Sequence, residues 1–152
     1  MGKLLRFLAL GFAVSLAVSL PAKADEAGKP HRLVLQVDSS DAATINLTLN
    51  NAINVIDYYR DKKEEVEVDI VAFGPGLNMY RTDKSNVRDR IKHLSDYGYP
   101  FKIQFSACNN TKTAMERAEG HPVELIPEAT VVPSGVVQIM QRQEEGWSYV
   151  RP

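Results

Sequence analysis

A chain of 152 residues, of which 44% are hydrophobic and 24% charged, has the length and composition of one ordinary globular domain. Its 18 basic and 19 acidic residues form no basic stripe that could follow a phosphate backbone, which argues against nucleic acid as a partner. The single cysteine excludes an internal disulfide, so the apolar core must stabilise the fold by itself.

The first 24 residues have the order of a secretory signal. Lys3 and Arg6 form a basic region, residues 8–20 form an apolar region too short for a comfortable membrane span, and Ala22-Lys23-Ala24 matches a cleavage pattern. An uncleaved anchor or a buried N-terminal helix is the alternative. Because no twin-arginine pair is present, we expect export by the general secretory route to the periplasm, with no stable membrane span after cleavage.

Cleavage after Ala24 would remove three basic residues and no acidic one. The mature chain would then carry 15 basic and 19 acidic residues, a net charge near −4. We expect it to consist of a flexible leader, residues 25–31, and one domain, residues 32–152.

The mature chain alternates predicted strands with predicted helices. Apolar runs and apolar–polar alternation predict strands at 33–37, 66–72, 101–105, 129–132 and 147–150. Apolar residues at helical spacing predict helices after 38–41, over 86–97, from about 109 to 119, and after 133–135. This order predicts an α/β fold with a parallel sheet and helices on both of its faces. Three asparagines at helical spacing in the first helix (46, 50 and 54) indicate a solvated face or a contact with a neighbouring subunit or loop.

Four unusual stretches directly follow predicted strands: 38–39, 73–76, 106–108 and 132–135. Because ligands and reacting groups collect beyond the carboxyl ends of parallel strands, we expect these stretches to share one rim. Their candidate rim or thiolate-supporting residues are Asp38, Gly74, Gly76, Asn109, Asn110, Ser134 and Gly135. Asp38 is either an acid or base or, more commonly for such a position, a helix cap. The glycines on both sides of Pro75 mark a tight turn, but neither a dinucleotide fingerprint nor a P-loop.

Cys108 is the candidate catalytic residue, at a predicted strand-to-helix turn with Asn109 and Asn110 as candidate caps. The free N–H groups and the dipole of a helix start favour the thiolate, which is the nucleophile. A lone cysteine in an exported protein is buried and inert, paired with another molecule, or reactive, and this position favours the reactive state. Lys112 is the nearest cation along the chain, so we expect a moderate lowering of the thiol pKa. The three histidines (31, 93 and 121) form no metal-ligand spacing with Cys108, and we expect neither a metal nor a cofactor.

Several stretches resemble the small exported members of the DsrE/DsrF-like superfamily. They are LQVD (35–38), LNNAINV (49–55), VAFGPGL (71–77), SACNNT (106–111), VPSGVV (132–137), and Gln143 followed by GWSYVRP (146–152). The resemblance covers nearly all of the mature chain. It implies a three-layer α/β/α sandwich around a mainly parallel five-stranded sheet, and assembly into homo-oligomers.

The best understood members of that superfamily carry sulfur as a cysteine persulfide during sulfur oxidation or transfer-RNA thiolation. Cys108 matches the position of their cysteine, but the absence of a second cysteine excludes a relay within the chain, and the signal argues against transfer-RNA thiolation. The resemblance therefore implies a periplasmic sulfur carrier, sulfurtransferase-like if it is catalytic, whose partner is a sulfur-donating or sulfur-accepting protein or a small sulfur compound. The alternative is a non-catalytic oligomeric binding or assembly module that uses the same rim for a small ligand or a partner protein.

Overall fold

The protein is described by a computed structural model over residues 28–152, so the signal-like segment lies outside the described residues. The strands are β1 (His31–Val37), β2 (Val66–Ala72), β3 (Lys102–Cys108), β4 (Ala129–Val132) and β5 (Ser148–Val150). They form one sheet in the order β4-β3-β2-β1-β5, and every neighbouring pair is parallel. The predicted parallel α/β sheet is confirmed. His31, which the sequence assigned to the leader, is the first residue of β1, and its N–H donates to the Glu65 carbonyl at 2.8 Å.

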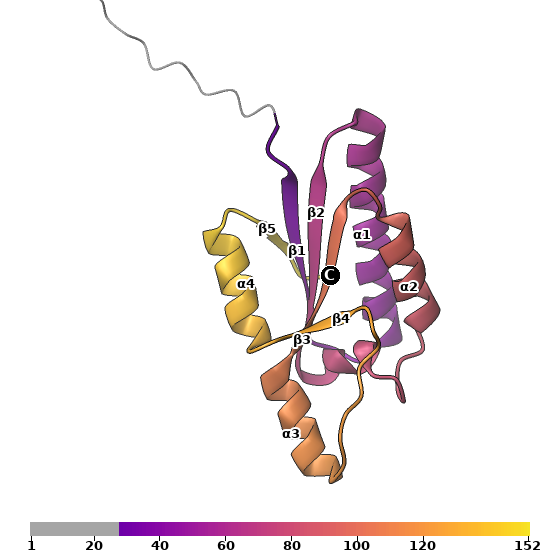
Figure 1. Cartoon of the computed structure of the whole chain (residues 1–152), viewed down its shortest axis with the longest axis vertical. Helices are drawn as coiled ribbons and strands as arrows, with labels where there is room; N and C mark the ends of the chain where they lie inside the picture. The colour runs from indigo at the N-terminus through magenta and orange to yellow at the C-terminus, as the bar shows by residue number, and fades with distance from the viewer. Residues whose placement is uncertain (1–27) are drawn as a thin grey trace, which may run out of the picture.

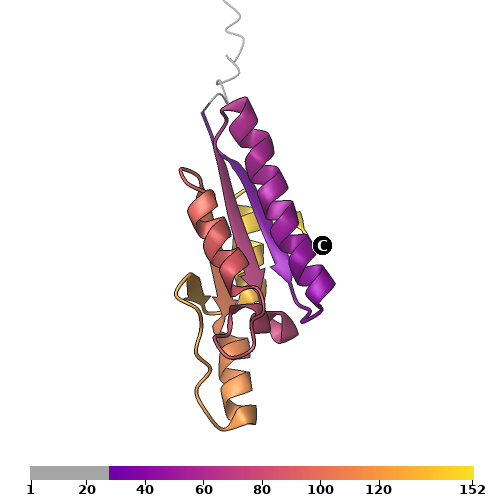
Figure 2. The same ribbon diagram turned by 90° about the vertical axis from the view of Figure 1, so that its right-hand side faces the viewer.

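The helices are α1 (Ala42–Lys62), α2 (Arg88–Tyr97), α3 (Asn109–Glu119) and α4 (Gly135–Glu144), with a 3₁₀ helix, η1 (Gly74–Tyr80), after β2. Helices α1 and α2 cover one face of the sheet and α4 covers the other (Figure 1). The expected three-layer sandwich is therefore confirmed. Helix α3 buries none of its residues and extends past the carboxyl ends of the strands, as Figures 1 and 2 both show. Within residues 28–152, no helix combines the length and the apolar character that crossing a membrane requires.

The two faces of the sheet differ in their packing because successive strand residues point to opposite sides. The main core lies under α1 and α2 and includes residues such as Leu35, Ile70 and Phe105. The cluster under α4 is much smaller and consists of Val34, Val71, Ile139 and Trp147, with Phe73 packed against it. The third layer therefore rests on the sheet with little apolar contact.

Helix α1 begins at an aspartate cap, but a different one from the candidate. The Asp41 carboxylate accepts the Thr44 N–H at 2.8 Å, so Asp41 is the N-cap and Asp38 is not. The predicted asparagine stripe contacts another helix of the same chain, because the Arg90 guanidinium of α2 donates to the side-chain oxygens of Asn46 and Asn50.

The glycine–proline–glycine turn opens η1 and brings it against the end of β1. A Cβ atom on Gly76 would lie 2.2 Å from the Val37 carbonyl oxygen, a distance that real side chains do not reach. Gly76 therefore allows a close approach between two backbone segments of the protein itself, which places η1 at the carboxyl edge of the sheet.

Candidate functional site

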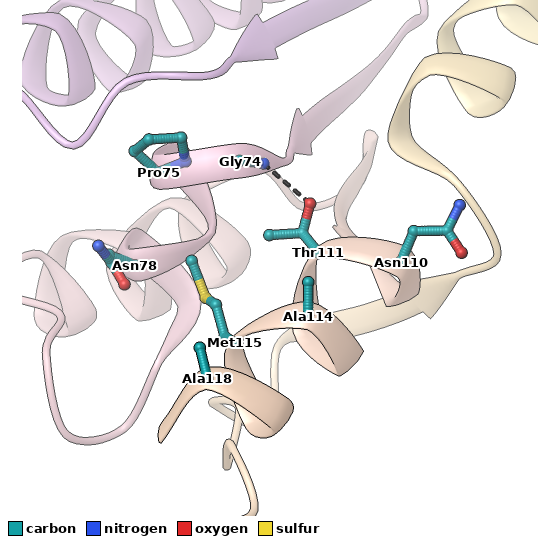
Figure 3. Close-up of a pocket in the computed structure, with 8 residues that line it drawn as sticks. All are labelled: Gly74, Pro75, Asn78, Asn110, Thr111, Ala114, Met115 and Ala118. Carbon is teal, nitrogen blue, oxygen red and sulfur yellow. Dashed lines mark hydrogen bonds between the residues drawn. The ribbon is translucent and has the colours of Figure 1, made fainter. Parts of the chain in front are cut away.

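Three of the four predicted rim stretches meet at the carboxyl edge of the sheet. Cys108 ends β3 and pairs in register with Val132, which ends β4, so the turn into α4 follows beside the thiol. From the neighbouring strand, the Gly74 N–H donates to the Thr111 hydroxyl of α3 at 2.9 Å (Figure 3). The ends of β2, β3 and β4 thus surround Cys108.

Cys108 itself is the N-cap of α3, with an extended backbone (φ −67°, ψ 116°). The expectation that Asn109 or Asn110 caps the helix is wrong: both are helical residues with exposed side chains, because α3 begins directly after the strand. Because no linker separates β3 from α3, the sulfur of Cys108 lies at the position of a capping oxygen. It makes no capping hydrogen bond to the helix, but the Thr111 hydroxyl and the N–H groups of Thr111 and Asn110 lower the pKa of the thiol by favouring its anion.

A second helix start lies close to the same sulfur. Val132 pairs in register with Cys108, and α4 begins three residues later at Gly135, whose N–H also lowers the pKa of the thiol. A Cβ atom on Gly135 would lie 2.9 Å from a ring carbon of Phe73, so glycine allows the start of α4 to pack this closely. The Ser134 hydroxyl does not face the thiol. It caps α4 by accepting the Val137 N–H at 3.5 Å.

These contacts act on the acidity of the thiol in opposite directions. Burial, which leaves Cys108 only 4% exposed, raises its pKa, because the charged form loses solvation. The nearby Thr111 hydroxyl and the N–H groups of Gly135, Thr111 and Asn110 favour the anion and lower it, and the net result is a lowered pKa. Lys112, the cation nearest in sequence, pairs with Glu116, so the donors are backbone and hydroxyl groups.

Asp38 lies away from the thiol. It follows β1, and β2 separates β1 from β3, so strand spacing places the two ends about 10 Å apart. Its carboxylate is held by the Arg151 guanidinium, with N–O distances of 2.8 and 3.1 Å, and by the Gln36 amide at 3.1 Å. This arrangement joins the C-terminal segment to β1 and gives Asp38 no position as an acid or base for Cys108.

A pocket of about 600 Å³ lies between η1 and α3 (Figure 3). Its walls are largely apolar and are lined by Gly74, Pro75, Asn78, Asn110, Thr111, Ala114, Met115 and Ala118. Cys108 does not line the pocket, but Thr111 does, and the Thr111 hydroxyl also lowers the pKa of the thiol. The buried Asn78 side-chain oxygen on this wall accepts no hydrogen bond from residues 28–152.

A buried polar network under α4 was missed from the sequence. The Asp69 carboxylate of β2 is fully buried and accepts from the Ser106 hydroxyl at 2.6 Å, the Gln138 amide at 2.8 Å and the Arg142 guanidinium at 2.8 Å. The available signal was an acidic residue between Val68 and Ile70, in the centre of a strand that is covered on both faces.

A second ionic group fixes α3 against the segment that follows η1. Arg81 is 1% exposed and donates to both carboxylate oxygens of Glu119 at 2.6 and 2.7 Å, and Asp83 is its other partner. The hydrogen bonds from Arg81 and then Lys84 lower the pKa of Glu119 to about 2. Helix α3 is therefore held at its far end by charge, since it buries no side chain.

In the part of the chain that the structure describes, no three His, Cys, Asp or Glu side chains gather closely enough to hold a metal ion. The three histidines lie apart from Cys108: His31 stacks on Tyr59, His93 on Tyr97, and His121 is exposed.

Comparisons with known proteins give one informative similarity. No family model matches the chain, and no curated protein matches it either. Among solved structures, it is similar to MTH1491, a protein of unknown function from Methanobacterium thermoautotrophicum, with a TM-score of 0.67 and 33% identity. The similarity covers 80% of this chain and 99% of the archaeal one. The resemblance to the DsrE/DsrF-like superfamily stays a prediction, whereas this identity over nearly the whole archaeal chain shows that the present chain belongs to the same family as MTH1491.

Proposed function

We propose that the protein is an exported sulfur carrier that holds a persulfide on Cys108. The observation that supports this function best is the set of donors around the sulfur, which come from the starts of two helices and from the Thr111 hydroxyl. Such a set stabilises negative sulfur, and a persulfide is more readily held as its anion in the same field of N–H groups.

The loading step needs no external oxidant. The Cys108 thiolate attacks the outer sulfur of a donor persulfide, R–S–SH, and forms a new S–S bond while the S–S bond of the donor breaks. The donor thiolate, R–S⁻, leaves with the electron pair, and Cys108 becomes Cys–S–SH. Transfer to an acceptor thiolate is the same reaction in reverse, so one cysteine suffices for a carrier.

Cyanide release of bound sulfur tests this function. Purified mature protein is incubated with polysulfide, freed of excess reagent, and treated with cyanide, which removes the outer persulfide sulfur as thiocyanate. We expect close to one thiocyanate per chain from the native protein and none from Cys108→Ser, which keeps a small residue at the helix start. Equal thiocyanate from both proteins would contradict loading at Cys108.

A second candidate is a binding or assembly module without sulfur chemistry. Two observations favour it: Cys108 is only 4% exposed, and Thr111 lines the largely apolar pocket of about 600 Å³. The rate of iodoacetamide labelling separates the two candidates. A carrier is labelled while folded, at a rate that rises with the thiolate fraction, whereas labelling only after unfolding supports the binding module.

Export belongs to the same proposal and has its own test. The order of basic, apolar and Ala-x-Ala residues predicts cleavage after Ala24. N-terminal sequencing of protein recovered from the periplasm is expected to begin at Asp25. Full-length chain found in the soluble cytoplasm would contradict this prediction.

A further inference from the structure

The buried carboxylate of Asp69 lies in the middle of β2, away from the rim that carries the thiol. It is fully buried, and each of its three hydrogen bonds comes from a side chain. A buried ion pair contributes little net stability compared with apolar packing, but removal of one partner is disruptive. Such a group is therefore better suited to fixing the relative position of the elements that it joins.

The elements joined by Asp69 are those that build the thiol site. Ser106 precedes Cys108 by two residues on the same face of β3. Gln138 and Arg142 lie on α4, about one and two turns after Gly135. The carboxylate thus links the strand that ends at the sulfur to the helix that begins at Gly135, three residues after Val132, the β4 residue paired with Cys108.

A further contact closes the network between β3 and α4. The Arg142 guanidinium donates to the Gln104 side-chain oxygen at 3.2 Å, and the Gln104 amide donates to the Ser106 hydroxyl at 2.9 Å. The same guanidinium lies 4.5 Å from the ring centroid of Trp147. The contacts of Arg142 restrain α4 relative to the sheet, and the contact between Gln104 and Ser106 joins the two β3 side chains of the network.

Apolar packing holds α4 only weakly by comparison. Among its residues only Gly135 and Ile139 are buried, whereas Val136, Val137 and Met140 are about half exposed. Because the apolar contact is small, the polar network has a large share in deciding where the first turn of α4 lies.

We propose that Asp69 is a positioning residue, which holds the start of α4 over Cys108 and so controls how strongly the Gly135 N–H stabilises negative sulfur there. Asp69 has no contact with the sulfur and takes no part in the exchange of bonds. For a persulfide this inference rests on the proposed carrier function, whereas for the free thiol it stands without it.

Two effects of Asp69 on the thiol pKa can be told apart: positioning of α4, as proposed, and the direct electrostatic effect of the carboxylate charge. On the packed elements, the nearest charged residues along the chain are Asp69 of β2, Arg142 of α4, and the Lys112–Glu116 pair of α3. The others lie towards the far ends of these elements: Glu67 of β2, Arg117 and Glu119 of α3, and Glu144 of α4. Lys102 lies at the opposite end of β3, and neither η1 nor β4 contains a charged residue. If Asp69 acted only through its charge, its neutralisation would leave Arg142 unopposed and would lower the thiol pKa. Loss of positioning has the opposite effect and raises it.

The test is a pH titration of the single cysteine, followed by the NMR signal of its ¹³C-labelled Cβ. Asp69→Asn and Gln138→Ala, which removes one link without changing any charge, are compared with Gln141→Ala, an exposed glutamine on the same helix. We expect both network variants to raise the thiol pKa and to lower the thiolate fraction at pH 7 about three- to tenfold, the order expected for loss of one ordinary hydrogen bond. Gln141→Ala is expected to match the native protein.

A lowered or unchanged thiol pKa in folded Asp69→Asn would overturn the proposal. If that variant does not fold, an unchanged pKa in Gln138→Ala overturns it equally. The titration uses protein that has not been incubated with any sulfur compound. If both network variants raise the thiol pKa but the native protein loads no sulfur, the carrier function alone is refuted. If the native protein loads sulfur but the variants leave the thiol pKa unchanged, the positioning role alone is refuted.

Discussion

Thr111 connects three parts of the candidate site through one hydroxyl group. Its oxygen accepts the Gly74 N–H at 2.9 Å, the hydroxyl favours the thiolate of Cys108, and the residue also lines the neighbouring pocket. A hydroxyl can accept and donate at the same time, so one side chain can hold the turn after β2 while it supports the sulfur.

Thr111→Val removes the hydroxyl and keeps the shape of the side chain. We expect the thiol pKa of Cys108 to rise, because a donor to the thiolate is lost, and the folded protein to lose about 1–3 kcal/mol as the Gly74 N–H loses its acceptor. The rate of iodoacetamide labelling against pH and the urea unfolding midpoint measure the two effects. Thr113→Val, on the same helix, is the matched control, and an unchanged labelling profile in Thr111→Val would count against the role of the hydroxyl.

At the scale of the elements, α3 is held at its two ends by different forces. Its start is joined to β2 through Thr111, and its end is joined through Glu119 to the buried Arg81. Between these points no residue is fully buried, although Met115 packs against the main core, so the attachment of the far end depends largely on the ionisation of Glu119.

This attachment predicts acid sensitivity. Because the pKa of Glu119 is lowered to about 2 in the folded state, its contribution is complete above the unfolded-state value of about 4.3 and is lost as the pH falls through 2. We expect Glu119→Gln to be less stable at pH 7 and to lose less stability between pH 4.5 and 2 than the native protein. Thermal unfolding at several pH values measures both, with the exposed Glu124→Gln as control; identical pH profiles for Glu119→Gln and the native protein would exclude this contribution.

The local patterns of the sequence predict the helices and strands well, but not the contacts between side chains that are far apart in the sequence. Alternation over residues 101–105 shows which residues of this segment face the main core, and the strand-to-helix turn at Cys108 follows from the same reasoning. The cap was misassigned because asparagine preferences do not locate a helix start to within one or two residues. The partners of Asp69 lie 69 and 73 residues away, at Gln138 and Arg142, and no local periodicity indicates such a pairing.

At the scale of the whole molecule, α4 presents an apolar surface to solvent. Val136, Val137 and Met140 are 47–53% exposed. Clustered apolar side chains on a soluble protein commonly mark an interface. This surface supports the proposal that copies of the chain associate.

Light scattering tests association at micromolar concentration. We expect the native mature protein to form an oligomer and Val137→Glu to shift it towards the monomer, because a charge would be buried at the contact. Leu47→Glu is the matched control, since Leu47 is equally exposed, at 48%, but lies on α1. A native protein that is strictly monomeric would contradict the proposed association.

The intact mass of the protein after exposure to a sulfur donor tests the carrier function most directly. Native mature protein incubated with polysulfide is expected to gain the mass of one sulfur atom, to lose it on reduction, and to show no gain as Cys108→Ser. A native protein whose mass stays unchanged, while its thiol is still labelled by iodoacetamide in the folded state, would contradict the persulfide on Cys108.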